Sequence, residues 1–163
     1  MLVLLPYYLF GQKVYIEDMM TKMKCSKLTC LSDFLTSNGF NYHDVSQYSS
    51  HKVYWYASDK MVESTGKGVS REQNLVSFDF SNATSKPISI TLLTNDRNYF
   101  SAFVQRMSNI KFTEEKSETT KSGNLIVDYH SALFPEFSLR IVTSRQSDDN
   151  ESWTHYEITL KWK

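Results

Sequence analysis

Short runs in which apolar and polar residues alternate dominate this chain, and they restrict it to folds with an antiparallel sheet. Residues 76–80 read VSFDF and residues 88–92 read ISITL. Successive side chains of a strand point to opposite faces, so this alternation predicts strands with one buried and one wet face. Further segments of strand composition are residues 53–56, 111–119, 125–130, 137–143 and 153–162.

Apolar residues recur every three to four positions in three other segments, as they do on one face of a helix. We expect Thr29 to cap the second helix and Gly39 to end it in a left-handed conformation. Asn95 or Asp96 is expected to cap the third helix. The three segments are residues 16–23, 30–38 and 97–109.

The predicted elements follow the same order in both halves of the chain. Residues 29–94 are assigned a helix and four candidate strands, of which three are the segments 53–56, 76–80 and 88–92, and residues 95–163 are assigned a helix and four more. Units of about 65 residues are only marginally stable alone, so we expect the two to form one compact unit. The predicted fold is α+β: a short N-terminal helix in residues 12–28, then two tandem helix-plus-antiparallel-sheet repeats, each a four-strand meander. The alternative is a coincidence of element order.

The first ten residues, MLVLLPYYLF, carry no charge and are followed by Gly11. A run of ten is too short to span a bilayer, which takes about 20 apolar residues. Its length and the small residue after it match the core of a secretory signal, so residues 1–11 are predicted to be a signal peptide. The basic segment that normally precedes such a core is missing. Either the true start lies upstream, or residues 1–11 form a buried strand.

Two cysteines, Cys25 and Cys30, are present in the chain. Their spacing differs from the two-residue spacing of redox and zinc pairs, so no metal is predicted there. In an exported protein they could form a disulfide. Residues five apart on one continuous helix point about 140° apart, so that bond requires a break between them. The alternative is two buried free thiols.

No group of residues has the spacing of a catalytic or cofactor site. The segment 66–68 lacks two elements of a phosphate loop, and the acidic segment 148–151 lacks the ligand spacing of a calcium loop. The histidines have no Cys or His partner at ligand spacing. We therefore predict no cofactor, no metal and no catalytic residue. The histidines are His43, His51, His130 and His155.

Three consecutive aromatic residues, Tyr54, Trp55 and Tyr56, form the most distinctive segment. In a strand, Trp55 faces one side and the two tyrosines face the other. If Trp55 is buried, the tyrosines are exposed and suited to a protein or glycan contact. In the alternative, both faces of the sheet are covered and the tyrosines pack under helices. The candidate binding residues are Tyr54, Tyr56 and the nearby His51.

Four segments carry a resemblance to known sequences: Leu-Phe-Gly-Gln at 9–12, Ile-Glu-Asp-Met at 16–19, Thr-Ser-Asn-Gly-Phe at 36–40, and ITLLTNDRNYF at 90–100. With them, the chain resembles uncharacterised exported proteins of flavobacteria and related Bacteroidota. The resemblance implies a periplasmic or cell-envelope location. It implies no activity and no site residues.

The chain holds 18 Lys and Arg against 18 Asp and Glu, so its formal net charge is zero. Nucleic-acid binding requires a clustered positive excess, so nucleic acid is not an expected partner.

The leading hypothesis is an exported, non-enzymatic module that binds a protein or an envelope component and has no transmembrane segment once mature. The alternative is a small-ligand binder or an unrecognised hydrolase, with a cleft between the repeats lined by Tyr54, Tyr56 and His51. The sequence predicts no oligomeric state.

Overall fold

The computed structural model of the protein describes residues 13–58, 74–147 and 152–163. The predicted signal peptide, the segment 66–68 and the acidic segment 148–151 lie outside these residues. The helices and strands, in chain order, are α1 (Ile16–Met23), α2 (Leu28–Ser37), β1 (Phe40–Gln47), β2 (His51–Ser58), β3 (Leu75–Ser81), β4 (Pro87–Thr94), α3 (Arg97–Asn109), β5 (Phe112–Thr119), β6 (Leu125–Ser131), β7 (Phe137–Ser147) and β8 (Ser152–Trp162).

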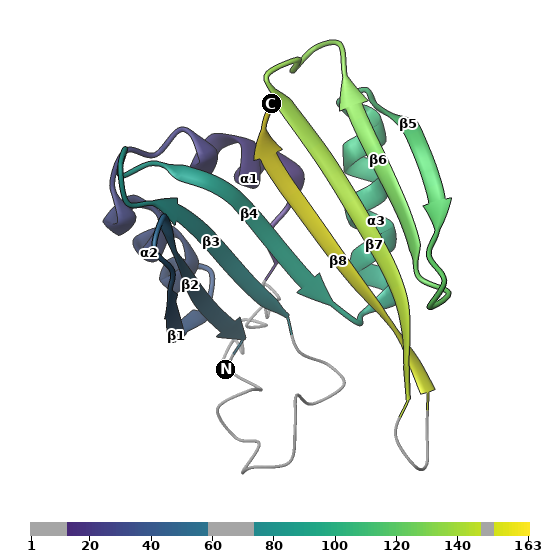
Figure 1. The fold of residues 1–163 in the computed structure, drawn as a ribbon, viewed down its shortest axis with the longest axis horizontal. Coiled ribbons are helices and arrows are strands. Elements are labelled where there is room, and N and C mark those ends of the chain that lie inside the picture. Colours follow the sequence, from purple (N-terminus) through teal and green to yellow (C-terminus); the bar gives the residue numbers. More distant parts are fainter. Residues whose placement is uncertain (1–12, 59–73, 148–151) are drawn as a thin grey trace, which may run out of the picture.

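The eight strands form a single antiparallel sheet, which confirms the predicted α+β class (Figure 1). The strand order is β1-β2-β3-β4-β8-β7-β6-β5, and β4 pairs with β8 at the centre. Each set of four strands thus runs in sequence order from one edge of the sheet to this central pair. The order is compatible with the two predicted four-strand meanders.

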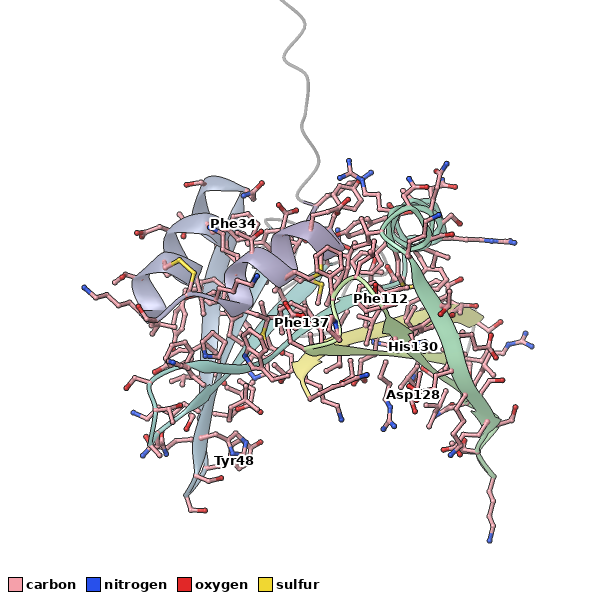
Figure 2. All side chains as sticks on the ribbon, turned by 90° about the horizontal axis from the view of Figure 1, so that it is seen from above. Phe34, Tyr48, Phe112, Asp128, His130 and Phe137 are labelled. Carbon is pink, nitrogen blue, oxygen red and sulfur yellow. A yellow bond between two sulfur atoms is a disulfide. The ribbon has the colours of Figure 1, made fainter. Side chains whose placement is uncertain are left out.

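All three helices lie on the same side of the sheet (Figure 2). α2 contacts β1 near one edge, α3 contacts β4 and β5, and α1 contacts β4, β8 and α3. The core lies between this helix layer and the inward-facing side chains of the strands. Its largest fully buried residues are Phe40, Tyr56, Phe78, Tyr99, Phe103 and Phe137, with Met19, Met23, Leu31, Leu35 and Ile90 among the aliphatic ones.

Helix boundaries agree with the sequence where a specific cap is present. The carboxylate of Asp96 accepts hydrogen bonds from the N–H groups of Asn98 and Tyr99, so it caps α3 as predicted. Gly39 has a φ of 80°, the left-handed conformation expected after α2. The prediction of Thr29 as the cap of α2 is wrong, since this helix already begins at Leu28.

The earlier start of α2 has a packing reason. Leu28 is partly buried and extends the apolar stripe of Leu31 and Leu35 by one turn. Lys27 precedes the helix in an extended conformation and makes no side-chain cap. Burial of an apolar side chain therefore outweighs the capping preference of Thr29.

Among the described residues, the helices are all too short or too polar to cross a membrane.

Candidate functional site

The side of the sheet opposite the helices is not covered by any of the described secondary-structure elements. Figure 2 shows the β1–β2 and β5–β6 hairpins bending away from the helix layer, so that this open face is concave. We call this surface the open face. It is built from the strand residues that alternate with the core positions, and it carries residues from all eight strands.

Strand pairing aligns the side chains of the open face in rows that cross the whole sheet. At the usual strand spacing of about 4.8 Å, a row of eight residues is about 34 Å long. The central row is Asp44, Trp55, Ser77, Thr91, Thr159, Arg140, Asp128 and Lys116. A second row, beside it, is Ser46, Val53, Asp79, Ser89, Lys161, Ser138, His130 and Thr113.

Side chains of the central row are held in place by contacts with one another. The hydroxyls of Thr91 and Thr159 lie 3.0 Å apart across the β4–β8 pair. Arg140 donates two hydrogen bonds to the carboxylate of Asp128, at 2.7 Å and 3.0 Å. The guanidinium of Arg140 thereby lowers the pKa of Asp128. A bidentate pair fixes both side chains, so this part of the surface is ordered before any partner arrives.

The second row contains buried polar atoms that make no hydrogen bond. In the described part of the chain, Asp79 Oδ1, His130 Nδ1 and Ser138 Oγ are buried without a hydrogen bond. His130 and Ser138 face each other on β6 and β7. Burial raises the pKa of the Asp79 carboxyl, although nearby His51 acts in the opposite direction.

His51 lies near the end of the open face, at the start of β2. Its ring stacks on Tyr48, with centroids 4.6 Å apart, and its Nδ1 is 2.9 Å from Ser50 Oγ. Its Nε2 lies 3.9 Å from Asp79 Oδ1. These are the residue types of a hydrolytic triad, and the backbone N–H of Asn82 donates a hydrogen bond to the carbonyl of Ser50.

The three candidate binding residues do not line one site. Tyr56 points toward the helices and is 2 % exposed, in ring contact with Phe78. Tyr54 also points toward the helix side and is partly buried, whereas His51 lies on the open face. The tyrosines thus pack under the helix layer, and Trp55 takes the outward position. A single cleft lined by Tyr54, Tyr56 and His51 is not present, because odd and even residues of β2 face opposite ways.

Cys25 and Cys30 are joined by a disulfide, with their Cα atoms 6.1 Å apart. Cys25 lies in the connection between α1 and α2, and Cys30 lies in the first turn of α2. The helix break that such a bond requires is therefore this connection. Across the described residues, no three His, Cys, Asp or Glu side chains are grouped so as to hold a metal ion.

Of the three candidate binding residues, only His51 lies on the open face, and the alignment of outward residues into rows was not predicted. The available signal was the polar half of each alternation, such as Ser77 and Asp79 in β3. Those residues were assigned to a wet face, but their alignment across strands depends on the register of the strand pairs.

No family model, curated protein or solved structure matches this chain.

Proposed function

We propose that the protein is an exported, non-enzymatic module that binds another protein through the open face of its sheet. The observation that carries this proposal is the central row, in which eight aligned side chains cross the sheet from edge to edge. Such a row, with the second row beside it, offers an area of the order of the roughly 800 Å² that one partner contributes to a standard interface.

The chemistry of the open face favours a protein over other partners. Acidic and basic residues alternate along the central row, as in Arg140, Asp128 and Lys116. Nucleic acid would require an excess of positive charge, and so would an anionic lipid surface. Mixed charges and hydroxyls, beside two partly buried tryptophans and partly buried aliphatic residues such as Leu75 and Leu93, are typical of protein–protein interfaces.

The Cys25–Cys30 disulfide supports the proposal of export. Disulfides persist in oxidising compartments such as the periplasm and are rare in the cytosol. Together with the apolar leader in residues 1–11, this bond favours the periplasm or the cell envelope as the place of action.

We also propose that the two halves are repeats of one ancestral unit. Equivalent features recur 72 residues apart at the junction of helix and first strand: the helix ends Ser37 and Asn109, and the positive-φ residues Gly39 and Lys111. The same offset relates the buried residues Phe40 and Phe112, which begin β1 and β5. It also relates the two register shifts, between Tyr42 and Asp44 in β1 and between Glu114 and Lys116 in β5. Recurrence of a backbone irregularity at the same place supports duplication more strongly than element order alone.

The binding proposal is tested by quantitative affinity capture from native envelope extracts with three forms of the protein. The first is the wild type, and the second carries Glu157→Lys and Lys116→Glu on the open face. The third carries Asp33→Lys and Arg97→Glu on the outer surfaces of α2 and α3. All four positions are exposed, and both double variants conserve net charge.

We expect the wild type and the helix-side variant to retain the same partner equally. The open-face variant should lose about tenfold or more of the captured amount. If the open-face variant retained the partner and the helix-side variant lost it, the interface would lie on the helix side, and the proposal would be rejected. Absence of any specific protein with all three forms would also reject the proposal.

A further inference from the structure

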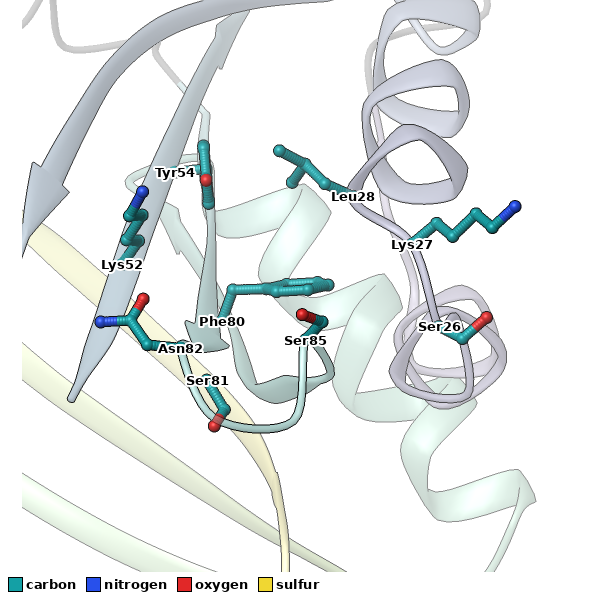
Figure 3. Close-up of a pocket in the computed structure, with 9 residues that line it drawn as sticks. All are labelled: Ser26, Lys27, Leu28, Lys52, Tyr54, Phe80, Ser81, Asn82 and Ser85. Carbon is teal, nitrogen blue, oxygen red and sulfur yellow. The ribbon is translucent and has the colours of Figure 1, made fainter.

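A cavity of about 460 Å³ lies on the helix side of the sheet, away from the open face (Figure 3). It is bounded by the connection that leads from α1 into α2 and by the adjoining ends of β2 and β3. This volume is in the range typical of small-molecule sites.

One wall of the cavity is apolar. Leu28, Tyr54 and Phe80 come from three different elements, and Figure 3 shows their side chains pointing toward the same hollow. The rings of Tyr54 and Phe80 meet edge to face, with centroids 6.5 Å apart. Such a wall suits the hydrocarbon or aromatic body of a ligand.

The polar part of the lining contains cations but no acid. Lys27 and Lys52 line the cavity together with hydroxyl groups, of which Ser85 is one. Within the described residues, neither ammonium group has an ion-pair partner. Figure 3 shows Lys27 extending away from the hollow, so Lys52, which is partly buried, is the cation closer to the apolar wall. An ammonium group without an ion-pair partner, beside an apolar wall, favours an anion as its ligand.

The boundaries of the cavity are fixed by bonds that do not depend on a ligand. The Cys25–Cys30 disulfide closes the α1–α2 connection. On the opposite side, the Asn82 side chain donates to the carbonyls of Tyr48 and Ser49, at 3.3 Å each. These bonds tie the β1–β2 turn to the β3–β4 turn. A site whose walls are already ordered loses little conformational entropy when it binds.

From these observations we infer that the cavity binds a small organic anion. Its negatively charged group pairs with Lys52, and its apolar or aromatic body packs on Leu28, Tyr54 and Phe80. The inference is independent of the proposed function, because cavity and open face lie on opposite sides of the sheet.

The test uses two fluorescent probes with closely related aromatic bodies. The sulfonate 1-anilinonaphthalene-8-sulfonate carries a negative charge, and N-phenyl-1-naphthylamine carries none. Each is titrated into the wild type, into Lys52→Met, and into Lys161→Met as a control that removes the same charge from the open face. Urea unfolding of each variant verifies that the fold is retained.

We expect saturable one-to-one binding of the sulfonate to the wild type and to Lys161→Met. Lys52→Met should weaken this binding by about tenfold or more while leaving the neutral probe nearly unaffected. A further variant, Leu28→Ser, should weaken both probes. The inference fails if the sulfonate does not saturate, if Lys52→Met affects both probes equally, or if Leu28→Ser affects neither.

Discussion

The hydroxyl of Tyr99 in α3 hydrogen-bonds to both backbone groups of Val14, a residue 85 positions earlier in the chain. It accepts from the N–H of Val14 and donates to its carbonyl. Tyr99 is fully buried, and this burial raises the pKa of its hydroxyl well above the usual value. The segment that leads into α1 is thus fixed to α3 by one side chain.

Replacing Tyr99 by Phe should lower the free energy of unfolding by about 1–3 kcal/mol, because two buried backbone groups lose their partner. The matched control is Tyr48→Phe, since Tyr48 is 52 % exposed. We expect the control to change stability by no more than about 0.5 kcal/mol. Urea unfolding followed by circular dichroism measures both. Equal effects of the two substitutions would show that the Tyr99 hydroxyl contributes nothing.

Lys111 offers a test of the proposed duplication. It has a φ of 63°, at the position that Gly39 occupies in the first half with a φ of 80°. The left-handed conformation costs a residue with a Cβ roughly 1 kcal/mol. Lys111→Gly should therefore raise the melting temperature, whereas Gly39→Ala should lower it. A loss of stability on Lys111→Gly would mean that the two junctions are not equivalent.

The disulfide should stabilise the fold mainly by restricting the unfolded chain. The loop that it closes is short, so we expect Cys25→Ser/Cys30→Ser to lower the free energy of unfolding by about 2 kcal/mol. Iodoacetamide treatment of the unreduced, denatured wild type, followed by mass spectrometry, checks the bond directly. We expect no alkylation of either cysteine. Two alkylated cysteines in protein isolated from its native compartment would rule out the bond.

His155 in β8 should make stability depend on pH. Burial holds the pKa of its imidazole below the usual 6.5, so the unfolded state binds a proton more readily than the folded state. The stability that depends on His155 is fully present above pH 6.5. It is lost as the pH falls through 6.5 toward the lower pKa of the folded state. The variant His155→Gln should lack this component. The check is the difference in unfolding free energy between wild type and variant from pH 8 to pH 5, and a constant difference would contradict the prediction.

Seven of the eight strands and α3 were predictable because their signals are local, whereas β1 has no alternation of buried and exposed residues. In β3 and β4 the alternation sits within one strand, and Asp96 caps the helix that directly follows it. The orientation of β2 was not predictable, since Tyr54, Trp55 and Tyr56 are suitable for either face. Pairing with Val76 and Phe78 of β3 places the tyrosines inside, and that pairing is a tertiary property.

The candidate site was harder to predict than the fold for the same reason. The central row joins residues that are far apart in the sequence, such as Asp44 and Arg140. Its continuity depends on the register of seven strand pairs. The bond between Tyr99 and Val14 likewise has no trace in the local sequence. The pattern of a single strand reveals which residues face outward, but not what stands beside them.

Photo-crosslinking in native cells tests the central proposal most directly. A benzoylphenylalanine is introduced at position 159, in the middle of the open face, or at position 105, on the exposed surface of α3. We expect a discrete crosslinked partner protein from position 159 and none from position 105. A partner crosslinked from position 105 alone, or from neither position, would contradict binding through the open face.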